Sequence, residues 1–232
     1  MALIWFLFRQ CLTSGSSGSA FSVRPHAGVS AMNSEGTFRL AFWGLLGLTM
    51  LMRIWFAIRV RRAGERLMPD RAAIQREGWR IFAIRLFVFL LLVALIVLLA
   101  RNPTWWSKLD FPLPFWLRWA GLALGLASLG LLTWTHVALG TLWSVPLQLR
   151  ANHRLVASGP YTRIRHPMYT AILAWATSLG FVIANWIPII FAVWAAVILV
   201  ARVPREEQMM LDQFGDEYRE YMKRTGRFLP KW

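Results

Sequence analysis

Cysteine and acidic groups are scarce in this chain of 232 residues. The chain has one cysteine, Cys11, so it can form neither a disulfide framework nor a thiolate metal site. A cysteine nucleophile is not expected either. Charged residues make up 16% of the sequence, against about 25% in an ordinary soluble domain. Only 11 residues are acidic, against 26 lysines and arginines. This shortage of charge points away from a soluble protein.

Long apolar runs take the place of the missing charge. Hydrophobic residues account for 57% of the chain, the mean hydropathy is +0.46, and 14 residues are tryptophan. The runs are continuous rather than alternating, which predicts an all-α integral membrane protein and argues against a β-barrel. A net charge of +15 does not indicate a nucleic-acid partner, because the basic residues collect at the ends of apolar runs.

We predict about five transmembrane helices, at residues 39–58, 81–100, 115–139, 167–184 and 187–203. Gly121 and Gly125, four residues apart, suggest a close-packing face on the third. Three regions follow from this count. Residues 1–36 are expected to be a disordered leader or the product of a start set too far upstream. Residues 37–140 form a three-helix membrane region, and residues 141–232 form a catalytic region of loop, helical hairpin and amphipathic cytoplasmic tail helix.

The positions of the arginines predict the orientation of these helices. An arginine-rich segment follows the first span, an arginine-bearing loop follows the third, and the tail is also charged. With five spans these three segments share one side, which the positive-inside rule makes cytoplasmic. The N-terminus is therefore expected outside and the C-terminus in the cytoplasm. The arginine bias suggests a bacterial inner membrane.

Polar side chains gather where the fourth predicted helix begins. Pro167 suits the first turn of a helix, which places His166 near the cap. Free backbone N–H groups and the helix dipole favour an anion at such an end. The alternative is a plain interfacial anchor, with Arg165 reaching the water and Tyr169 in the aromatic belt. Spacing alone does not separate the two.

A second polar cluster lies where the fifth predicted helix leaves the membrane. Arg202 and Glu206 are four residues apart and share a helical face, although Pro204 between them disturbs the helix locally. One interpretation is that the two residues form only a surface ion pair. An antiparallel hairpin, however, brings Val203 to Pro167, so the two clusters are expected to meet. A zwitterionic cationic cofactor would match their carboxylate, arginine, histidine and helix N-terminus. No metal-ligand spacing and no phosphate-binding glycine loop are evident.

The segment from residue 153 to residue 230 resembles the isoprenylcysteine carboxyl methyltransferase family, with its bacterial and phospholipid methyltransferase relatives. The resemblance rests on His153-Arg154-Leu155-Val156, Gly159-Pro160-Tyr161, Arg165-His166-Pro167-Met168-Tyr169, Glu206-Glu207 and Phe214-Gly215-Asp216-Glu217-Tyr218. Ala171 departs from it, since relatives commonly have glycine there.

The resemblance implies a membrane methyltransferase that uses S-adenosyl-L-methionine and a lipophilic small-molecule or lipid substrate. It implies catalytic roles for Arg202, which would engage the acceptor, and for Glu206. The cofactor contacts that the resemblance and its motifs imply are His153, Arg154, Leu155, Val156, Gly159, Tyr161, Arg165, His166, Pro167, Met168, Tyr169, Glu206 and Glu207. No metal is implied.

The methyl acceptor stays open at this point. A carboxylate of isoprenylcysteine type would give Arg202 a clear task, whereas a phospholipid amine or a thiol would leave it less to do. Two further alternatives are a sterol-reductase-like membrane enzyme, for which no nicotinamide-binding motif is present, and a membrane scaffold without catalysis.

Overall fold

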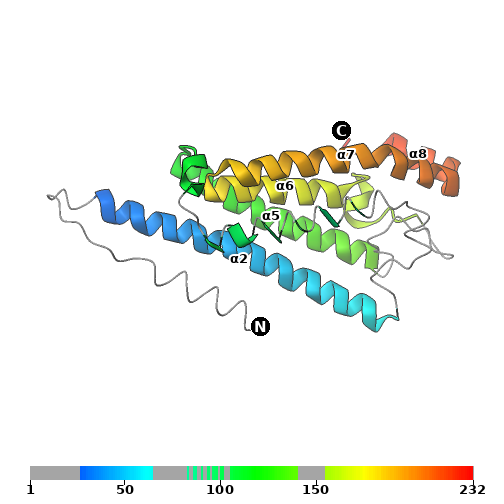
Figure 1. The fold of residues 1–232 in the computed structure, drawn as a ribbon. Helices are drawn as coiled ribbons and strands as arrows, with labels where there is room; N and C mark the ends of the chain where they lie inside the picture. The colour runs from blue at the N-terminus through cyan, green and yellow to red at the C-terminus, as the bar shows by residue number, and fades with distance from the viewer. Residues whose placement is uncertain are drawn as a thin grey trace.

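The described part of this computed structural model is helical. It covers residues 27–64, 105–140 and 155–231, with scattered residues between 83 and 101. The main elements are α2 (Ala27–Arg62), α5 (Phe115–Leu139), α6 (Pro167–Ile183), α7 (Trp186–Phe214) and α8 (Asp216–Arg224), with short 3-10 turns η1 (Trp106–Leu109) and η3 (Gly159–Thr162). The long helices run side by side along one axis, and α8 lies at one end (Figure 1).

Three of these helices are long and apolar enough to cross a bilayer: residues 35–62 of α2, all of α5 and all of α7. Helix α6 is apolar but has 17 residues, which gives it a length of roughly 26 Å. Large apolar side chains on the outer faces are exposed, among them Leu51 (66%) and Ile190 (64%). Such faces suit lipid, and the prediction of an integral membrane protein is confirmed. The predicted span 81–100 lies mostly outside the described residues, so the count of five stays a prediction.

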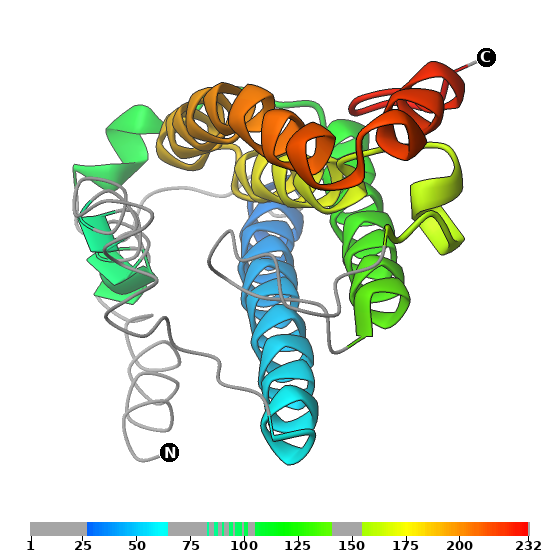
Figure 2. The same cartoon turned by 90° about the vertical axis from the view of Figure 1, so that its right-hand side faces the viewer.

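Helix α6 lies at the centre of the bundle. It packs against α5, α7 and α2, and the end-on view places it between α7 and the other two helices (Figure 2). Glycines permit its approach to α5, as predicted. A Cβ added at Gly121 would lie 2.6 Å from Phe181 Cβ, and one at Gly125 would lie 2.8 Å from Ser178 Oγ. Small residues at a helix contact let two backbones approach closely, which is how membrane helices gain packing contacts.

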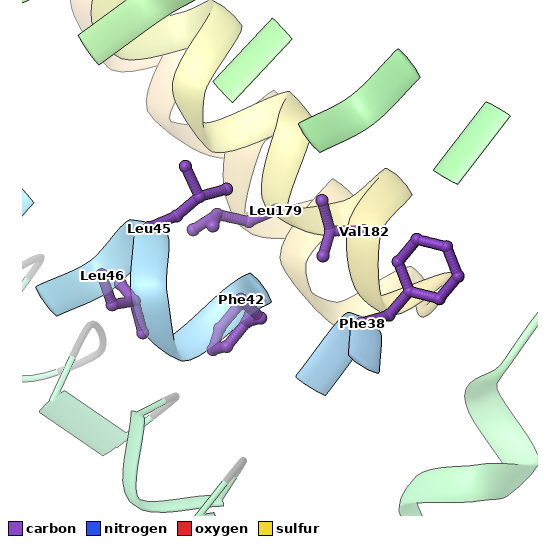
Figure 3. Close-up of a cluster of buried hydrophobic side chains, with 6 residues drawn as sticks. All are labelled: Phe38, Phe42, Leu45, Leu46, Leu179 and Val182. Atoms are coloured by element: carbon purple, nitrogen blue, oxygen red, sulfur yellow. The ribbon is translucent and has the colours of Figure 1, made fainter. Parts of the chain in front are cut away.

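An apolar cluster joins α2 to α6. Phe38, Phe42, Leu45 and Leu46 follow a helical stripe along α2 and face α6 (Figure 3). Their partners on α6 are Leu179 and Val182, and all six side chains are buried. The side of α2 away from this cluster is exposed and apolar. One stripe of α2 therefore serves protein packing, and the rest of its surface suits lipid.

Arg118 of α5 ties three helices together at the end of the bundle where α6 finishes. Its Nε donates to the carbonyl of Val182 at 3.1 Å, its guanidinium pairs with Glu35 of α2, and it lies 4.0 Å from the ring centroid of Phe38. The carbonyls in the last turn of a helix lack helical partners, so this cation caps α6. A single arginine inside an apolar run was not singled out from the sequence.

The α6–α7 hairpin turn is fixed by Asn185. Ala184 adopts the left-handed conformation at φ 55°, and Asn185 then caps α7 by accepting from the Ile187 N–H at 2.9 Å. The Asn185 amide also donates to Asp110 at 2.7 Å and to the Trp106 carbonyl at 3.2 Å. The predicted turn at residues 185–186 is confirmed. A fixed turn matters because it sets how the far ends of α6 and α7 face one another.

Two helix boundaries differ from prediction. Helix α2 begins at Ala27, inside the segment expected to be a leader, and residues 1–26 lie outside the described part. Helix α7 does not end near Val203 but continues through Pro204 to Phe214. A proline inside a helix costs about 3 kcal/mol. Here Val203 and Glu207, four residues apart, are both buried on one face of the helix. The burial of this face offsets the cost of the proline, so the helix continues. The amphipathic tail helix is α8, which buries Tyr218 and Tyr221.

Candidate active site

The site begins at the first residues of α6. Pro167 occupies the first turn, and His166 is the N-cap with φ −121° and ψ 54°. This agrees with the predicted start of the fourth span. Because proline has no N–H, it suits a position whose N–H would lack a helical partner anyway. The His166 side chain, which is 11% exposed, therefore lies at the N-terminal end of α6.

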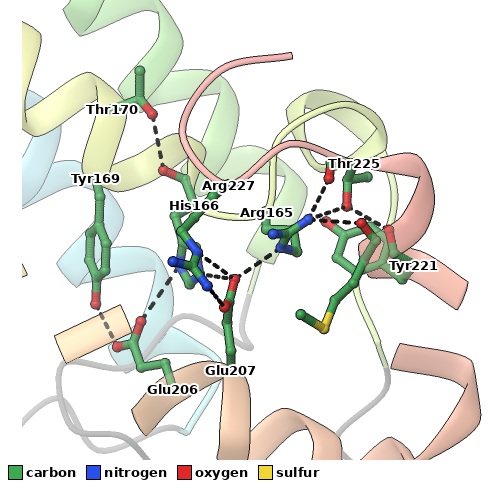
Figure 4. Close-up of polar contacts among 10 residues, drawn as sticks. Arg165, His166, Tyr169, Thr170, Glu206, Glu207, Tyr221, Thr225 and Arg227 are labelled. Carbon is green, nitrogen blue, oxygen red and sulfur yellow. Dashed lines mark hydrogen bonds and ion pairs between the residues drawn. The ribbon is translucent and has the colours of Figure 1, made fainter. Parts of the chain in front are cut away.

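Glu206 of α7 meets this end of α6 (Figure 4). Its Oε1 accepts from the Tyr169 hydroxyl at 2.5 Å and from Arg202 Nε at 2.7 Å. Its Oε2 lies 3.6 Å from His166 Nδ1. The predicted meeting of the two clusters is therefore confirmed, and the Arg202–Glu206 pair is more than a lone surface pair. The Glu206 side chain is 14% exposed, and that of Arg202 is 25% exposed.

Glu207, the next residue, is occupied by two guanidinium groups. Arg165 Nε donates to Oε1 at 3.0 Å, and Arg227 Nη2 donates to Oε2 at 2.5 Å. Arg227 Nε adds a longer bond to Oε1 at 3.3 Å. The Glu207 side chain is 5% exposed, so the two cations supply the compensation that a buried carboxylate requires. These contacts suit a structural role better than the predicted cofactor contact.

Arg165 is likewise bonded within the protein through Nε and Nη1. Besides Glu207, its guanidinium donates to the carbonyls of Met222 at 3.1 Å and of Thr225, and to the Thr225 hydroxyl at 3.3 Å. Its side chain is 10% exposed. Arg165 thus joins the start of α6 to α7 and to the end of α8, and its contacts too are those of a structural residue.

His166 sits in an aromatic and acidic enclosure. Its ring stacks on that of Tyr169 with centroids 5.5 Å apart and planes 9° apart, and the Phe228 ring lies 6.0 Å away. One ring nitrogen faces Glu206, and the other lies 3.4 Å from Glu207 Oε1. Burial lowers the pKa of His166, and the two carboxylates oppose that shift only in part. The imidazole is therefore neutral at neutral pH.

A short stretch after α8 closes the site, and we call residues Thr225–Phe228 the closing segment. Gly226 O accepts from the Arg165 N–H at 2.8 Å, and Arg227 O accepts from the His166 N–H at 3.0 Å. Phe228 O accepts from the Thr170 hydroxyl at 2.7 Å. The closing segment therefore runs parallel to the residues before α6 and holds their backbone in place.

Two tyrosines join α8 to the 3-10 turn η3 beside the site. The Tyr221 hydroxyl donates to the carbonyl of Tyr161 at 2.7 Å. Burial raises the pKa of Tyr221 to about 12, and burial also raises the pKa of Tyr161. Both phenols therefore stay protonated at neutral pH, and neither is available as a phenolate base.

The structure describes some of the remaining predicted site residues. Leu155 and Val156 are half-buried in the extended stretch before η3, and Met168 is half-buried in the first turn of α6. Gly159 has φ +60° and lies against α5, where an added Cβ would be 3.2 Å from Trp134 Nε1. The structure does not bring Gly159 into contact with the two carboxylates. His153 and Arg154 lie outside the described residues.

The donor set agrees with an amino-acid cofactor that carries positive charge. Glu206 Oε2 has no hydrogen bond to any residue that the structure describes, although Oε1 has two. His166 Nε2 is buried without a hydrogen-bond partner of good geometry in the same part of the chain. An ammonium or sulfonium group beside Glu206 would complete the pairing of that carboxylate. In the described ranges no group of three or more metal-binding side chains is present.

The closing segment was not predicted from the sequence. Arg227 neutralises Glu207, and the main-chain oxygens of residues 226–228 hold the start of α6. One signal was available: two adjacent glutamates at a helix end attract cations, and the tail offers further arginines besides Arg165 and Arg202. Position alone could not say whether Arg219, Arg224 or Arg227 would supply the other cation.

Comparison with known proteins confirms the family resemblance. Residues 121–212 match the isoprenylcysteine carboxyl methyltransferase family. The match begins inside α5, which the sequence analysis had left outside the resemblance, and ends before α8. A protein-S-isoprenylcysteine O-methyltransferase of Arabidopsis thaliana is 32% identical over 87 residues, which is 37% of this chain and 44% of that protein.

Two bacterial proteins are also similar. A cobalt-zinc-cadmium resistance protein of Cupriavidus metallidurans is 32% identical over 117 residues, which is 49% of this chain and 54% of that protein. An uncharacterized protein of Bacillus subtilis is 22% identical over 174 residues, or 73% and 96% of the two chains.

Among solved structures, a eukaryotic intramembrane Ras methyltransferase matches with a TM-score of 0.47 and 25% identity, over 50% of this chain and 42% of that one. The chain spans about half the length of the first curated relatives that it matches.

Proposed function

We propose that this chain is a membrane-embedded methyltransferase that uses S-adenosyl-L-methionine and acts on a lipophilic acceptor, with a carboxylate of isoprenylcysteine type as the acceptor group. The observation that carries the proposal is the contact between the start of α6 and the end of the apolar part of α7. There Glu206 joins Tyr169, Arg202 and His166 in one half-buried cluster. All four residues lie within the segment that matches the methyltransferase family.

Glu206 is the residue proposed to hold the cofactor. Tyr169 and Arg202 both bond to Oε1, which fixes the carboxylate plane and leaves Oε2 to face a cationic group. S-adenosyl-L-methionine, when bound, supplies a methyl group on a sulfonium that an incoming nucleophile can accept. His166, neutral and buried, forms an uncharged wall beside it. The wall keeps water out without competing for the negative charge of Glu206.

Arg202 is the residue proposed to orient the acceptor. Its Nε is used by Glu206, while its terminal nitrogens make no hydrogen bond to residues in the described ranges. Two N–H groups on a planar guanidinium match the two oxygens of a carboxylate. Arg202 can therefore hold an acidic acceptor and Glu206 at once. A reactive oxygen held in line with a methyl group gains rate mainly from this positioning.

The lipophilic part of the substrate would remain in the bilayer. The polar cluster lies near the end of an apolar stretch of α7 whose outer side chains, such as Val193 and Val197, are exposed. We propose that the tail lies against such faces while the head reaches Arg202. We also keep the inner membrane of a bacterium, with the site on the cytoplasmic side, as the proposed location. Exposed Arg59, Arg61 and Arg62 at the end of α2 favour that side.

Calorimetry of the purified protein with S-adenosylhomocysteine, the product form of the cofactor, tests the proposal. Wild-type protein should bind it, and the Glu206→Gln variant should bind at least about tenfold more weakly, because a charge-assisted bond is lost. The Glu220→Gln variant, which loses an exposed pair with Lys223, serves as the control. Binding of NADPH in place of S-adenosylhomocysteine would favour the reductase alternative and reject this proposal.

The acceptor group has a separate test. Membrane extracts are incubated with isotope-labelled cofactor, and labelled products are compared by mass spectrometry for wild type, Arg202→Ala and Arg205→Ala. Arg205 is exposed and three residues away, so it matches the lost charge. A carboxylate acceptor predicts methyl-ester products that disappear with Arg202→Ala alone. Turnover that survives this change would point to an amine or thiol acceptor, as in a phospholipid or thiol methyltransferase.

A further inference from the structure

We propose that Arg227 is a positioning residue of this site. Its guanidinium holds Glu207 beside His166, and its carbonyl fixes the backbone of His166. The inference rests on the proposed function, because it concerns the same site. It adds a residue that lies beyond the part of the chain matching the family, 20 positions after its partner Glu207.

Arg227 contacts the centre of the site in two ways. Through its side chain it binds both oxygens of Glu207, with Nη2 at 2.5 Å from Oε2 and Nε at 3.3 Å from Oε1. Through its main chain it accepts a hydrogen bond from the His166 N–H at 3.0 Å. A single residue thereby sets the position of the His166 backbone and of the carboxylate that faces the His166 ring.

Glu207 depends on Arg227 more than on its other cation. Oε1 is shared by Arg165, Arg227 and the His166 ring, whereas Oε2 bonds to Arg227 alone within the described part of the chain. Without Arg227, a carboxylate that is 5% exposed keeps one oxygen unpaired, and such a group turns toward another donor. One such donor is His166 Nε2, which already lies 3.4 Å from the other oxygen, Oε1.

The charges around His166 make this dependence measurable. The groups that face the imidazole are Glu206 and Glu207 from α7, Tyr169 from α6, and Arg165 from the loop before α6. Arg227 reaches His166 through Glu207. Replacing Arg227 by a neutral residue leaves two carboxylates with less compensation beside the ring. The protonated imidazole is then favoured, and the pKa of His166 must rise.

The test compares the full-length Arg227→Gln, Arg227→Lys and Arg219→Gln proteins in detergent. Arg219→Gln is the control, since Arg219 pairs with Asp216 and its side chain is 64% exposed. Two quantities are measured: the titration of His166 by NMR of ¹⁵N-histidine, assigned with His166→Gln, and the affinity for S-adenosylhomocysteine by calorimetry.

Arg227→Gln should titrate His166 at a higher pH than wild type and bind S-adenosylhomocysteine about tenfold more weakly, a loss typical of a displaced binding group. Arg227→Lys keeps the charge but loses the two-pronged contact, so it should restore the titration and only part of the affinity. Arg219→Gln should match wild type in both. Equal His166 titrations in Arg227→Gln and Arg219→Gln would overturn the inference.

If Arg227→Gln does not fold, Arg227→Lys decides on affinity: a severalfold loss supports positioning, and wild-type affinity overturns it. The His166 titration is recorded without any cofactor. It therefore separates a failure of this inference from a failure of the proposed methyltransferase function, which the wild-type calorimetry alone decides.

Discussion

Glu206 and Glu207 are adjacent in sequence, yet the structure surrounds them differently, and replacing each by glutamine should separate binding from stability. Glu207 is surrounded by Arg165 and Arg227 and lies 5% exposed. Glu206 lies 14% exposed and keeps one oxygen free of hydrogen bonds to described residues. We expect Glu207→Gln to unfold at a lower temperature, and Glu206→Gln to unfold near the wild-type temperature but to lose cofactor affinity.

The size of the Glu207 effect follows from burial. Removing one partner of a buried ion pair costs about 3 to 5 kcal/mol, because the remaining charge is left uncompensated. Arg165 is 10% exposed and bears that cost, whereas Arg227 is 47% exposed and is screened by water. We therefore expect Glu207→Gln to lower the free energy of unfolding by about 3 kcal/mol, the lower end of this range. At about 2 to 4 °C per kcal/mol for a chain of this length, the melting midpoint falls by about 6 to 12 °C.

The assay is thermal unfolding in detergent, followed by tryptophan fluorescence, with calorimetry of S-adenosylhomocysteine on the same samples. Glu220→Gln is the matched control, since its partner Lys223 and Glu220 itself are 72% and 69% exposed. Exposed helix pairs are worth under about 1 kcal/mol, so its midpoint should stay within about 2 °C of wild type. A Glu207→Gln midpoint as close to wild type as that of Glu220→Gln would refute the reasoning about burial.

Three other changes have defined outcomes. Gly125→Leu should lower the melting midpoint by several degrees, because its Cβ meets Ser178 and Leu45 at 2.8 Å, while Gly130→Ala, where the Cβ meets open space, should not. Burial lowers the pKa of His166 in the folded protein, so its contribution to stability is complete above the unfolded pKa of about 6.5 and is lost as pH falls below that value; melting midpoints of His166→Gln that fall with pH as steeply as wild type would contradict this. Tyr169→Phe removes the hydroxyl bond to the glutamate cluster and should weaken S-adenosylhomocysteine binding about tenfold in calorimetry, with little change in melting midpoint.

The apolar runs and the positions of proline and glycine predicted much of the helical arrangement. Apolar runs predicted the described helices α2, α5, α6 and α7, Pro167 marked the start of α6, and the glycine spacing marked the face of α5 that packs closely. The contact between the two polar clusters also followed from sequence, because an antiparallel hairpin brings the same ends of its helices together. These features depend on local spacing, and local spacing is visible in a single chain.

Three other features depend on contacts between residues far apart in sequence and were not predicted. Helix α7 passes Pro204 because buried contacts on both sides outweigh the local cost of proline. Arg118 is buried inside α5, where Glu35 and Val182 supply partners that lie far away in sequence. Arg227 was one of several arginines in a charged tail, and only the fold shows which of them reaches Glu207.

The parallel alignment of residues 163–166 with residues 225–228 has a consequence for synthesis on the ribosome. Helices α6 and α7 leave the ribosome first. Arg227, which pairs with Glu207, follows 20 residues after its partner. Until Arg227 has been synthesised, Arg165 is the one of these two arginines that can pair with Glu207. Glu207 therefore gains its second cation only after the closing segment has been translated and has packed beside residues 163–166.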